Sequence, residues 1–140
     1  MQRRVFIKNG CLACLGISIT GSLLQSCAAT GLPVVKTAAK NNVLEIPLEK
    51  FTANDPFLLV RAEKLENDIL LVKKEDHYKA LYMQCTHEGV ALTVTKNKLV
   101  CAAHGSTFDF DGNVLQEPAL KPLKEFKTTV QNKSILIQLS

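Results

Sequence analysis

Two short segments of this chain carry the side chains best suited to chemistry. Residues 85–89 read Cys-Thr-His-Glu-Gly, and residues 101–106 read Cys-Ala-Ala-His-Gly-Ser. Each segment offers one thiolate and one imidazole, and both groups bind transition metals. The combined ligand set is Cys85, His87, Cys101 and His104. We therefore expect one metal centre held between two loops.

Zinc is the main alternative for this ligand set, because tetrahedral zinc accepts two cysteines and two histidines. Zinc motifs, however, usually pair Cys with Cys and His with His, whereas each segment here carries one of each. Two structural cysteines and two incidental histidines would be a further interpretation. The mixed pairing of Cys and His in each segment therefore argues against zinc.

The pattern Cys-x-His followed by Cys-x-x-His-Gly-Ser resembles that of the Rieske [2Fe–2S] family, over roughly residues 43–139. In a Rieske centre, two cysteines hold one iron and two histidines hold the other. The resemblance therefore implies one [2Fe–2S] cluster, with Cys85 and Cys101 on one iron. His87 and His104 would bind the second iron, and their outer ring nitrogens would make its reduction depend on pH.

Other positions of the family pattern bear on the reduction potential. Ser106 matches a hydroxyl that hydrogen-bonds a bridging sulfide in high-potential members, whereas Phe108 replaces their sulfur-bonding tyrosine. Fewer hydrogen bonds to the cluster lower its potential. Val90 and Ala103 occupy the positions of a disulfide that joins the two loops in quinol-oxidising members. The resemblance implies a middle-range potential and argues against a quinol-oxidising site.

Two neighbouring segments complete the predicted site. Residues 117–123 resemble the proline loop that covers the third side of the cluster, and an ordinary turn before a strand is the alternative. The stretch between the loops is shorter than in most members. It predicts a hairpin with strands at 91–95 and 99–101 and a tight turn at Lys96-Asn97 or Asn97-Lys98. A shorter hairpin bears on partner recognition more than on metal binding.

The first 26 residues predict an export signal. Residues 2–8 resemble a twin-arginine motif, and the apolar segment 11–24 is short for a transmembrane helix, which needs about 20 residues. Residues 24–27 resemble a lipobox that would place a lipid on Cys27, and an uncleaved signal anchor is the alternative. Both interpretations indicate a bacterial envelope protein, anchored to a membrane and facing the periplasm or exterior.

The five cysteines fit this division of the chain. Cys11 and Cys14 lie in the signal, so we interpret their Cys-x-x-Cys spacing as accidental. Cys27 would carry lipid, which leaves Cys85 and Cys101 for iron. We therefore expect no disulfide, although an oxidising compartment would permit one.

Charge and composition exclude a nucleic-acid partner. The net charge of +4 comes from 17 basic and 13 acidic residues, and the signal holds three of the basic residues and no acid. Without it the net charge falls to about +1, and aromatic residues make up only 6% of the chain. No arrangement of nucleophile, base and orienting group appears, because His87 and His104 are assigned to the metal centre. His77 lies in a charged turn, and we expect it to be exposed and not a ligand.

The rest of the chain predicts an all-β fold. We expect a signal at 1–26, a tether at 27–42, and a Rieske-like antiparallel sandwich or barrel at 43–140, with an inserted cluster-binding subdomain of two loops at about 84–122. Residues 109–113 predict a hairpin turn and lack the distant Glu of a calcium loop. Short alternating or apolar runs bounded by turn residues predict the strands, which we place at 43–48, 57–62, 69–73, 78–83, 123–130 and 134–139.

The function that the resemblance implies is one-electron transfer by a membrane-tethered envelope carrier or oxidoreductase subunit. Its partners would be a redox protein or a quinol-linked membrane complex, and we expect no substrate chemistry of its own. The alternative is a non-redox envelope lipoprotein of the same fold that binds zinc or no metal.

Overall fold

The computed structural model describes residues 31–52 and 54–140. The twin-arginine-like segment, the lipobox and Cys27 lie outside these residues. Within them, the secondary structure is β-strand apart from one short 3-10 helix, η1 (Leu48–Lys50). This confirms the all-β prediction. No helix in this part of the chain has the length and apolar character to cross a bilayer.

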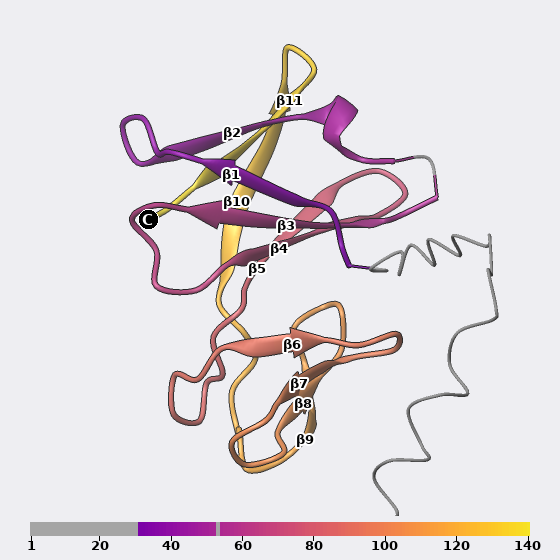
Figure 1. Cartoon of the computed structure of the whole chain (residues 1–140), viewed down its shortest axis with the longest axis vertical. Coiled ribbons are helices and arrows are strands. Elements are labelled where there is room, and N and C mark those ends of the chain that lie inside the picture. The colour runs from indigo at the N-terminus through magenta and orange to yellow at the C-terminus, as the bar shows by residue number, and fades with distance from the viewer. Residues whose placement is uncertain (1–30, 53) are drawn as a thin grey trace, which may run out of the picture. The chain divides into compact units, whose positions relative to one another are not determined.

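Eleven strands of the described residues form two sheets, which lie at opposite ends of this part of the chain in Figure 1. The larger base sheet has the order β1-β3-β4-β5-β10-β11-β2. Its strands are β1 (Val34–Thr37), β2 (Val43–Pro47), β3 (Phe57–Ala62), β4 (Ile69–Lys73), β5 (Tyr78–Tyr82), β10 (Glu125–Gln131) and β11 (Ser134–Gln138). The smaller sheet has the order β6-β7-β8-β9, with strands β6 (Leu92–Val94), β7 (Leu99–Cys101), β8 (Thr107–Phe108) and β9 (Val114–Gln116).

Two tight turns connect strands of the base sheet. Asn132 and Lys133 join β10 to β11 with positive φ angles of 49° and 64°, the backbone that a two-residue hairpin turn requires. Asn41 and Asn42 adopt the same pair of angles between β1 and β2, and asparagine tolerates this conformation better than most residues. Because β1 and β2 are the two edges of the sheet, the second turn brings the edges together.

Strand β1 corrects the expected extent of the tether. The sequence placed residues 27–42 in a tether, but Val34 to Thr37 pair with Leu59 to Ala62 of β3. This is the only parallel pair among the strands of the described residues. The part of the segment from Val34 onward therefore belongs to the base sheet.

Strand β4 is buried on both faces, which explains its unbroken apolar sequence. Ile69 and Leu71 face the core of the base sheet, because alternate residues of a strand point to opposite faces. Leu70 and Val72 face a second core, which also contains Leu81 of the neighbouring β5. The two cores thus share β4 and β5 as a common wall. The second core contains both cysteines of the predicted metal centre.

The inserted subdomain follows directly from this wall. The chain leaves β5, forms the small sheet, and returns through residues 117–123 to β10, which pairs with β5. Strands β6 and β7 form the expected hairpin, and the Thr95 N–H donates to the carbonyl of Lys98 across its turn. Lys96-Asn97 are therefore the central turn residues, the first of the two predicted alternatives.

Candidate metal centre

The two loops that carry the cysteines share one backbone design. In the first loop, the N–H of Gly89 donates to the Cys85 carbonyl at 2.8 Å, and the Cys85 N–H donates to the Val90 carbonyl at 2.8 Å. In the second loop, the N–H of Gly105 donates to Cys101 at 3.0 Å, and Cys101 donates to Ser106 at 2.9 Å. Each cysteine therefore closes its own loop with two backbone hydrogen bonds.

A glycine ends each loop in a conformation that other residues adopt with difficulty. The φ angles of Gly89 and Gly105 are +74° and +80°. Little stands where a side chain would be added at Gly105, since the nearest atom is the Gln116 amide nitrogen at 3.9 Å. The glycine is thus required by the backbone angle rather than by crowding.

The cysteines and histidines of the loops lie in opposite environments. Cys85 and Cys101 are almost fully buried among apolar residues of the second core and form no disulfide. His87 and His104 are exposed, and their rings lie edge to face with centroids 4.9 Å apart. The site therefore offers two sulfur ligands from the core and two nitrogen ligands at the surface.

The predicted proline loop is fixed to both cysteine loops by hydrogen bonds. The Ala119 N–H donates to the buried Ser106 hydroxyl oxygen at 3.0 Å, and the Thr86 hydroxyl donates to the Lys121 carbonyl at 2.7 Å. The Ala119 side chain is buried, whereas Leu120 is 80% exposed. Residues 117–123 thus form a third wall beside the two loops, more than an ordinary turn would provide. The Ser106 hydroxyl accepts from Ala119 and keeps its own hydrogen for another acceptor.

The remaining family positions carry the side chains that the sequence suggested. Phe108 is fully buried in the same core as the cysteines and has no hydroxyl to donate. Val90 and Ala103 are exposed at the positions of the absent loop disulfide. The two loops are connected instead through hydrogen bonds to the third wall.

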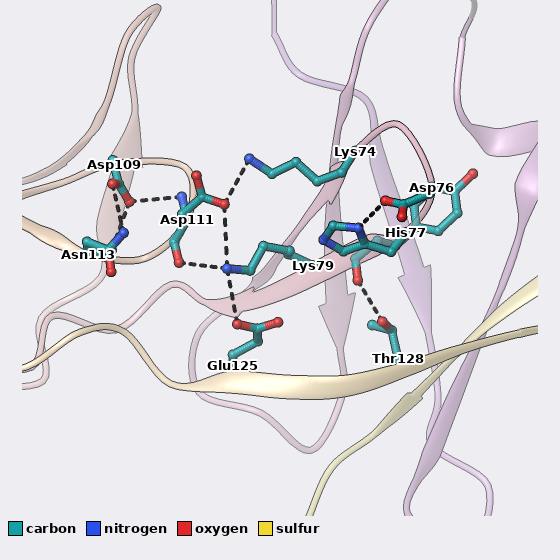
Figure 2. A network of polar contacts seen from close by, with 10 residues as sticks. Lys74, Asp76, His77, Lys79, Asp109, Asp111, Asn113, Glu125 and Thr128 are labelled. Atoms are coloured by element: carbon teal, nitrogen blue, oxygen red, sulfur yellow. Dashed lines mark hydrogen bonds and ion pairs between the residues drawn. The ribbon is translucent and has the colours of Figure 1, made fainter.

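A cluster of charged side chains connects the small sheet to the base (Figure 2). Asp111, in the turn between β8 and β9, accepts from Lys74 at 2.9 Å and lies 3.5 Å from Lys79. Lys79 also donates to the Asp111 carbonyl at 3.1 Å and lies 3.3 Å from Glu125 of β10. Beneath this turn, Gly112 lies close to Leu81 of the shared wall. The turn is therefore attached to the base by charge and by packing.

Both aspartates of this turn are stabilised as carboxylates. The Lys74 hydrogen bond lowers the pKa of Asp111, and partial burial only partly opposes it. Partial burial raises the pKa of Asp109. Hydrogen bonds from the Asn113 side chain and from the backbone of Asn113 and Asp111 lower the pKa by a larger amount. Its net pKa lies below the usual value. The turn thus has the local stabilisation expected of residues 109–113 as a hairpin turn.

His77 is remote from these loops in the base sheet. Its exposed ring contacts the adjacent Asp76 carboxylate at 2.6 Å, which lowers the pKa of Asp76 through a hydrogen bond. The expectation that His77 is exposed is confirmed.

Sequence reasoning missed one residue at the site, Glu88. Its carboxylate lies 3.7 Å from the Nδ1 atom of His104, and both side chains are substantially exposed. The ligand atoms of Glu88, His87 and His104 all lie within 4.8 Å of one another. The only sequence signal was an acid directly after a candidate histidine ligand.

The arrangement suits a two-iron centre better than one tetrahedral zinc ion. Around one zinc, four ligand atoms at about 2.0–2.3 Å from the metal all lie close together. In the part of the chain that the structure describes, the mutually close group includes neither cysteine. Separate pairs of sulfur and nitrogen ligands are what a Rieske cluster requires.

Comparison with known proteins agrees with this donor set. A family model described as Rieske [2Fe-2S] domain matches residues 44–127, more than half of the chain. The cytochrome b6-f complex iron-sulfur subunit of Synechococcus elongatus is 38% identical over 72 residues, which cover 48% of this chain and 40% of that protein. The cytochrome b6-f complex iron-sulfur subunit 3 of Nostoc sp. is 31% identical over 118 residues, covering 75% of this chain and 66% of that protein.

Comparison with solved structures shows a similar fold. A solved complex of reduced oxygenase and oxidized ferredoxin in carbazole 1,9a-dioxygenase contains a chain with a TM-score of 0.53 and 17% identity, covering 71% of this chain and 95% of that one. This likeness shows the fold alone. The chain spans about two fifths of the length of the first curated relatives it matches.

Fold and donor set define an iron–sulfur protein with an inserted cluster-binding subdomain. The chain belongs to the Rieske [2Fe–2S] domain family. It binds one Rieske-type [2Fe–2S] cluster.

Proposed function

We propose that this protein is a membrane-tethered electron carrier or oxidoreductase subunit of a bacterial cell envelope, facing the periplasm or exterior. The observation that carries the proposal is the pair of loops with buried cysteines and exposed histidines. A redox protein or a quinol-linked membrane complex is the proposed partner, because the curated relatives are subunits of cytochrome b6-f complexes. The tether is supported by the sequence of residues 1–27.

The ligands in this proposal are Cys85 and Cys101 for one iron and His87 and His104 for the other. When bound, the cluster supplies a one-electron redox couple. The two cysteines are enclosed by apolar residues, so the protein excludes water from the sulfur end of the site. The two imidazoles reach the surface, where a partner can approach their ring edges and where a proton can be exchanged.

Three other residues tune the site in this proposal. Ser106 accepts the Ala119 N–H and can donate its hydrogen toward the site, which favours a higher potential. Phe108 cannot donate, which favours a lower one. Thr86 fixes the first loop to the third wall through the Lys121 carbonyl. We expect a potential in the middle of the family range, which is roughly −150 to +300 mV.

Two experiments test the separate parts of the proposal. Changing Cys101→Ser should abolish the visible colour and the iron content of the purified protein, while His77→Ala should leave both unchanged. Retention of the coloured cluster by Cys101→Ser would contradict the ligand assignment.

Cell fractionation of the wild type and Cys27→Ser tests the tether. The wild type should sediment with membranes, and release by the substitution would identify Cys27 as the anchor. A Cys27→Ser protein that stays in the membrane would instead indicate an uncleaved signal anchor.

A further inference from the structure

We propose that the cluster-free protein binds a single divalent transition-metal ion, such as zinc or cobalt, through His87, Glu88 and His104. This inference concerns the protein before the cluster is inserted and does not depend on its redox function. It assigns a ligand role to Glu88, which the two-Cys, two-His set leaves unused.

The geometry of the three side chains supports one shared ion. Their ligand atoms lie within 4.8 Å of one another, and the Nδ1 atom of His104 is 3.7 Å from the Glu88 carboxylate. Two ligands of one tetrahedral zinc are about 3.4 Å apart, because each lies about 2.0–2.2 Å from the metal. Small rotations of exposed side chains therefore suffice to bring all three atoms onto one ion. In residues 31–52 and 54–140, no other group of three potential ligands is this compact.

The chemistry of the three side chains suits a divalent transition metal. Two imidazoles and one carboxylate with open remaining positions bind zinc, cobalt or ferrous iron. The Glu88 carboxylate supplies one negative charge toward a divalent cation, while the neutral imidazoles supply none. Because all three residues are exposed, water can fill the remaining positions and ions can enter directly from solvent.

The site excludes the cluster while it is occupied. The same two imidazoles are proposed to hold the outer iron, so they cannot serve both centres at once. The cysteines remain buried and outside the compact group. A bound ion would therefore delay cluster insertion without disturbing the fold, and exposure to zinc before insertion would trap a colourless protein.

Cobalt is the probe that distinguishes this site from a cysteine site. The untagged cluster-free chain, with Cys11, Cys14 and Cys27 changed to Ser in every sample, is titrated with Co²⁺ and followed by visible and near-ultraviolet absorption. We expect one ion per chain, with weak visible bands and no thiolate-to-cobalt charge-transfer band. Glu88→Gln should weaken Co²⁺ binding at least tenfold while circular dichroism shows an unchanged fold.

The base sheet offers a matched control. His77 and Asp76 form another exposed histidine–carboxylate contact at 2.6 Å but belong to no compact group of three ligands. His77→Ala should therefore leave the Co²⁺ affinity unchanged. Three results would overturn the proposal: no Co²⁺ binding, a strong thiolate charge-transfer band in the cluster-free chain, or equal affinity with and without Glu88→Gln in the same serine background. All three leave the proposed redox function untouched, because none concerns the cluster-loaded protein.

Discussion

The base sheet and the small sheet of the same chain are stabilised in different ways. Strands of the base are four to seven residues long, and its core consists of aliphatic and aromatic side chains from most of its strands. Strands of the small sheet are two or three residues long, and its core includes two cysteines. The small sheet depends on glycine turns and on hydrogen bonds to residues 117–123. It also packs against β4 and β5, which it shares with the base. The base therefore supplies the fold, and the inserted part supplies the site.

Replacing one buried leucine in each region should give the largest effect among the tests of this difference. Leu71 of β4 faces the base core and Leu99 of β7 faces the second core, and both are fully buried. Each change to Ala should cost about 2–5 kcal/mol, because it removes buried area and leaves a cavity. Leu71→Ala should lower the midpoint of global chemical unfolding. Leu99→Ala should mainly accelerate amide exchange in residues 85–106.

The comparison would fail if Leu99→Ala accelerated exchange in β10 and β11 as much as in the loops. In that case the two regions would unfold as one unit, and the small sheet would contribute to global stability as the base does.

The hydrogen bond at the third wall gives the next smaller effect. Ser106→Ala leaves the N–H of buried Ala119 without its acceptor, which costs about 1–3 kcal/mol. We expect faster exchange of the Ala119 amide and a lower midpoint potential of the bound cluster. Thr86→Val removes a more exposed hydrogen bond and should have a smaller effect on exchange. Equal exchange in Ser106→Ala and the wild type would show that the third wall is held by other contacts.

The loop glycines allow a test with an internal control. Gly105 has a φ of +80°, so an added side chain should cost about 1–2 kcal/mol although space is available. At Gly31, an added side-chain carbon would meet no atom within 4 Å beyond the chain neighbours, and φ is not positive. Gly105→Ala should therefore lower the temperature at which the cluster is lost, measured by visible absorption during heating. Gly31→Ala should leave this temperature unchanged. A similar decrease in both variants would show that the positive φ of Gly105 is not the cause.

The charged turn gives the smallest effect, and it depends on pH. The pKa of Asp109 is lowered in the folded protein, so its stabilisation is present above the unfolded pKa of about 3.9 and is lost as the pH falls through the folded value. A partly exposed group of this kind contributes about 1 kcal/mol or less. Between pH 6 and pH 3, the free energy of unfolding should fall more for the wild type than for Asp109→Asn. Parallel pH profiles of the two proteins would contradict this contribution.

The two regions also differ in how far the sequence predicted them. The runs at 57–62 and 69–73 gave strands with the observed bounds, because alternating or continuous apolar residues between turn signals allow few other structures. Strand β1 was missed because Val34 to Thr37 is short and stands among small and polar residues. Its pairing with β3 depends on a distant segment that no local pattern reveals.

At the site, the metal-binding residues were easier to predict than the hydrogen bonds that hold their loops in place. Cys85 and Cys101 were recognisable from their spacing, and the structure places both in one core. The bonds from Ala119 to Ser106 and from Thr86 to Lys121 were not predictable, since they join segments 13 and 35 residues apart. Glu88 was missed for a related reason: its proximity to His104 arises only when the two loops meet.

An EPR-monitored redox titration of the cluster-loaded protein tests the central claim most directly. We predict a reversible one-electron Rieske signal near the middle of the roughly −150 to +300 mV range. A protein with no reducible cluster would contradict an account in which Cys85, Cys101, His87 and His104 hold the two irons.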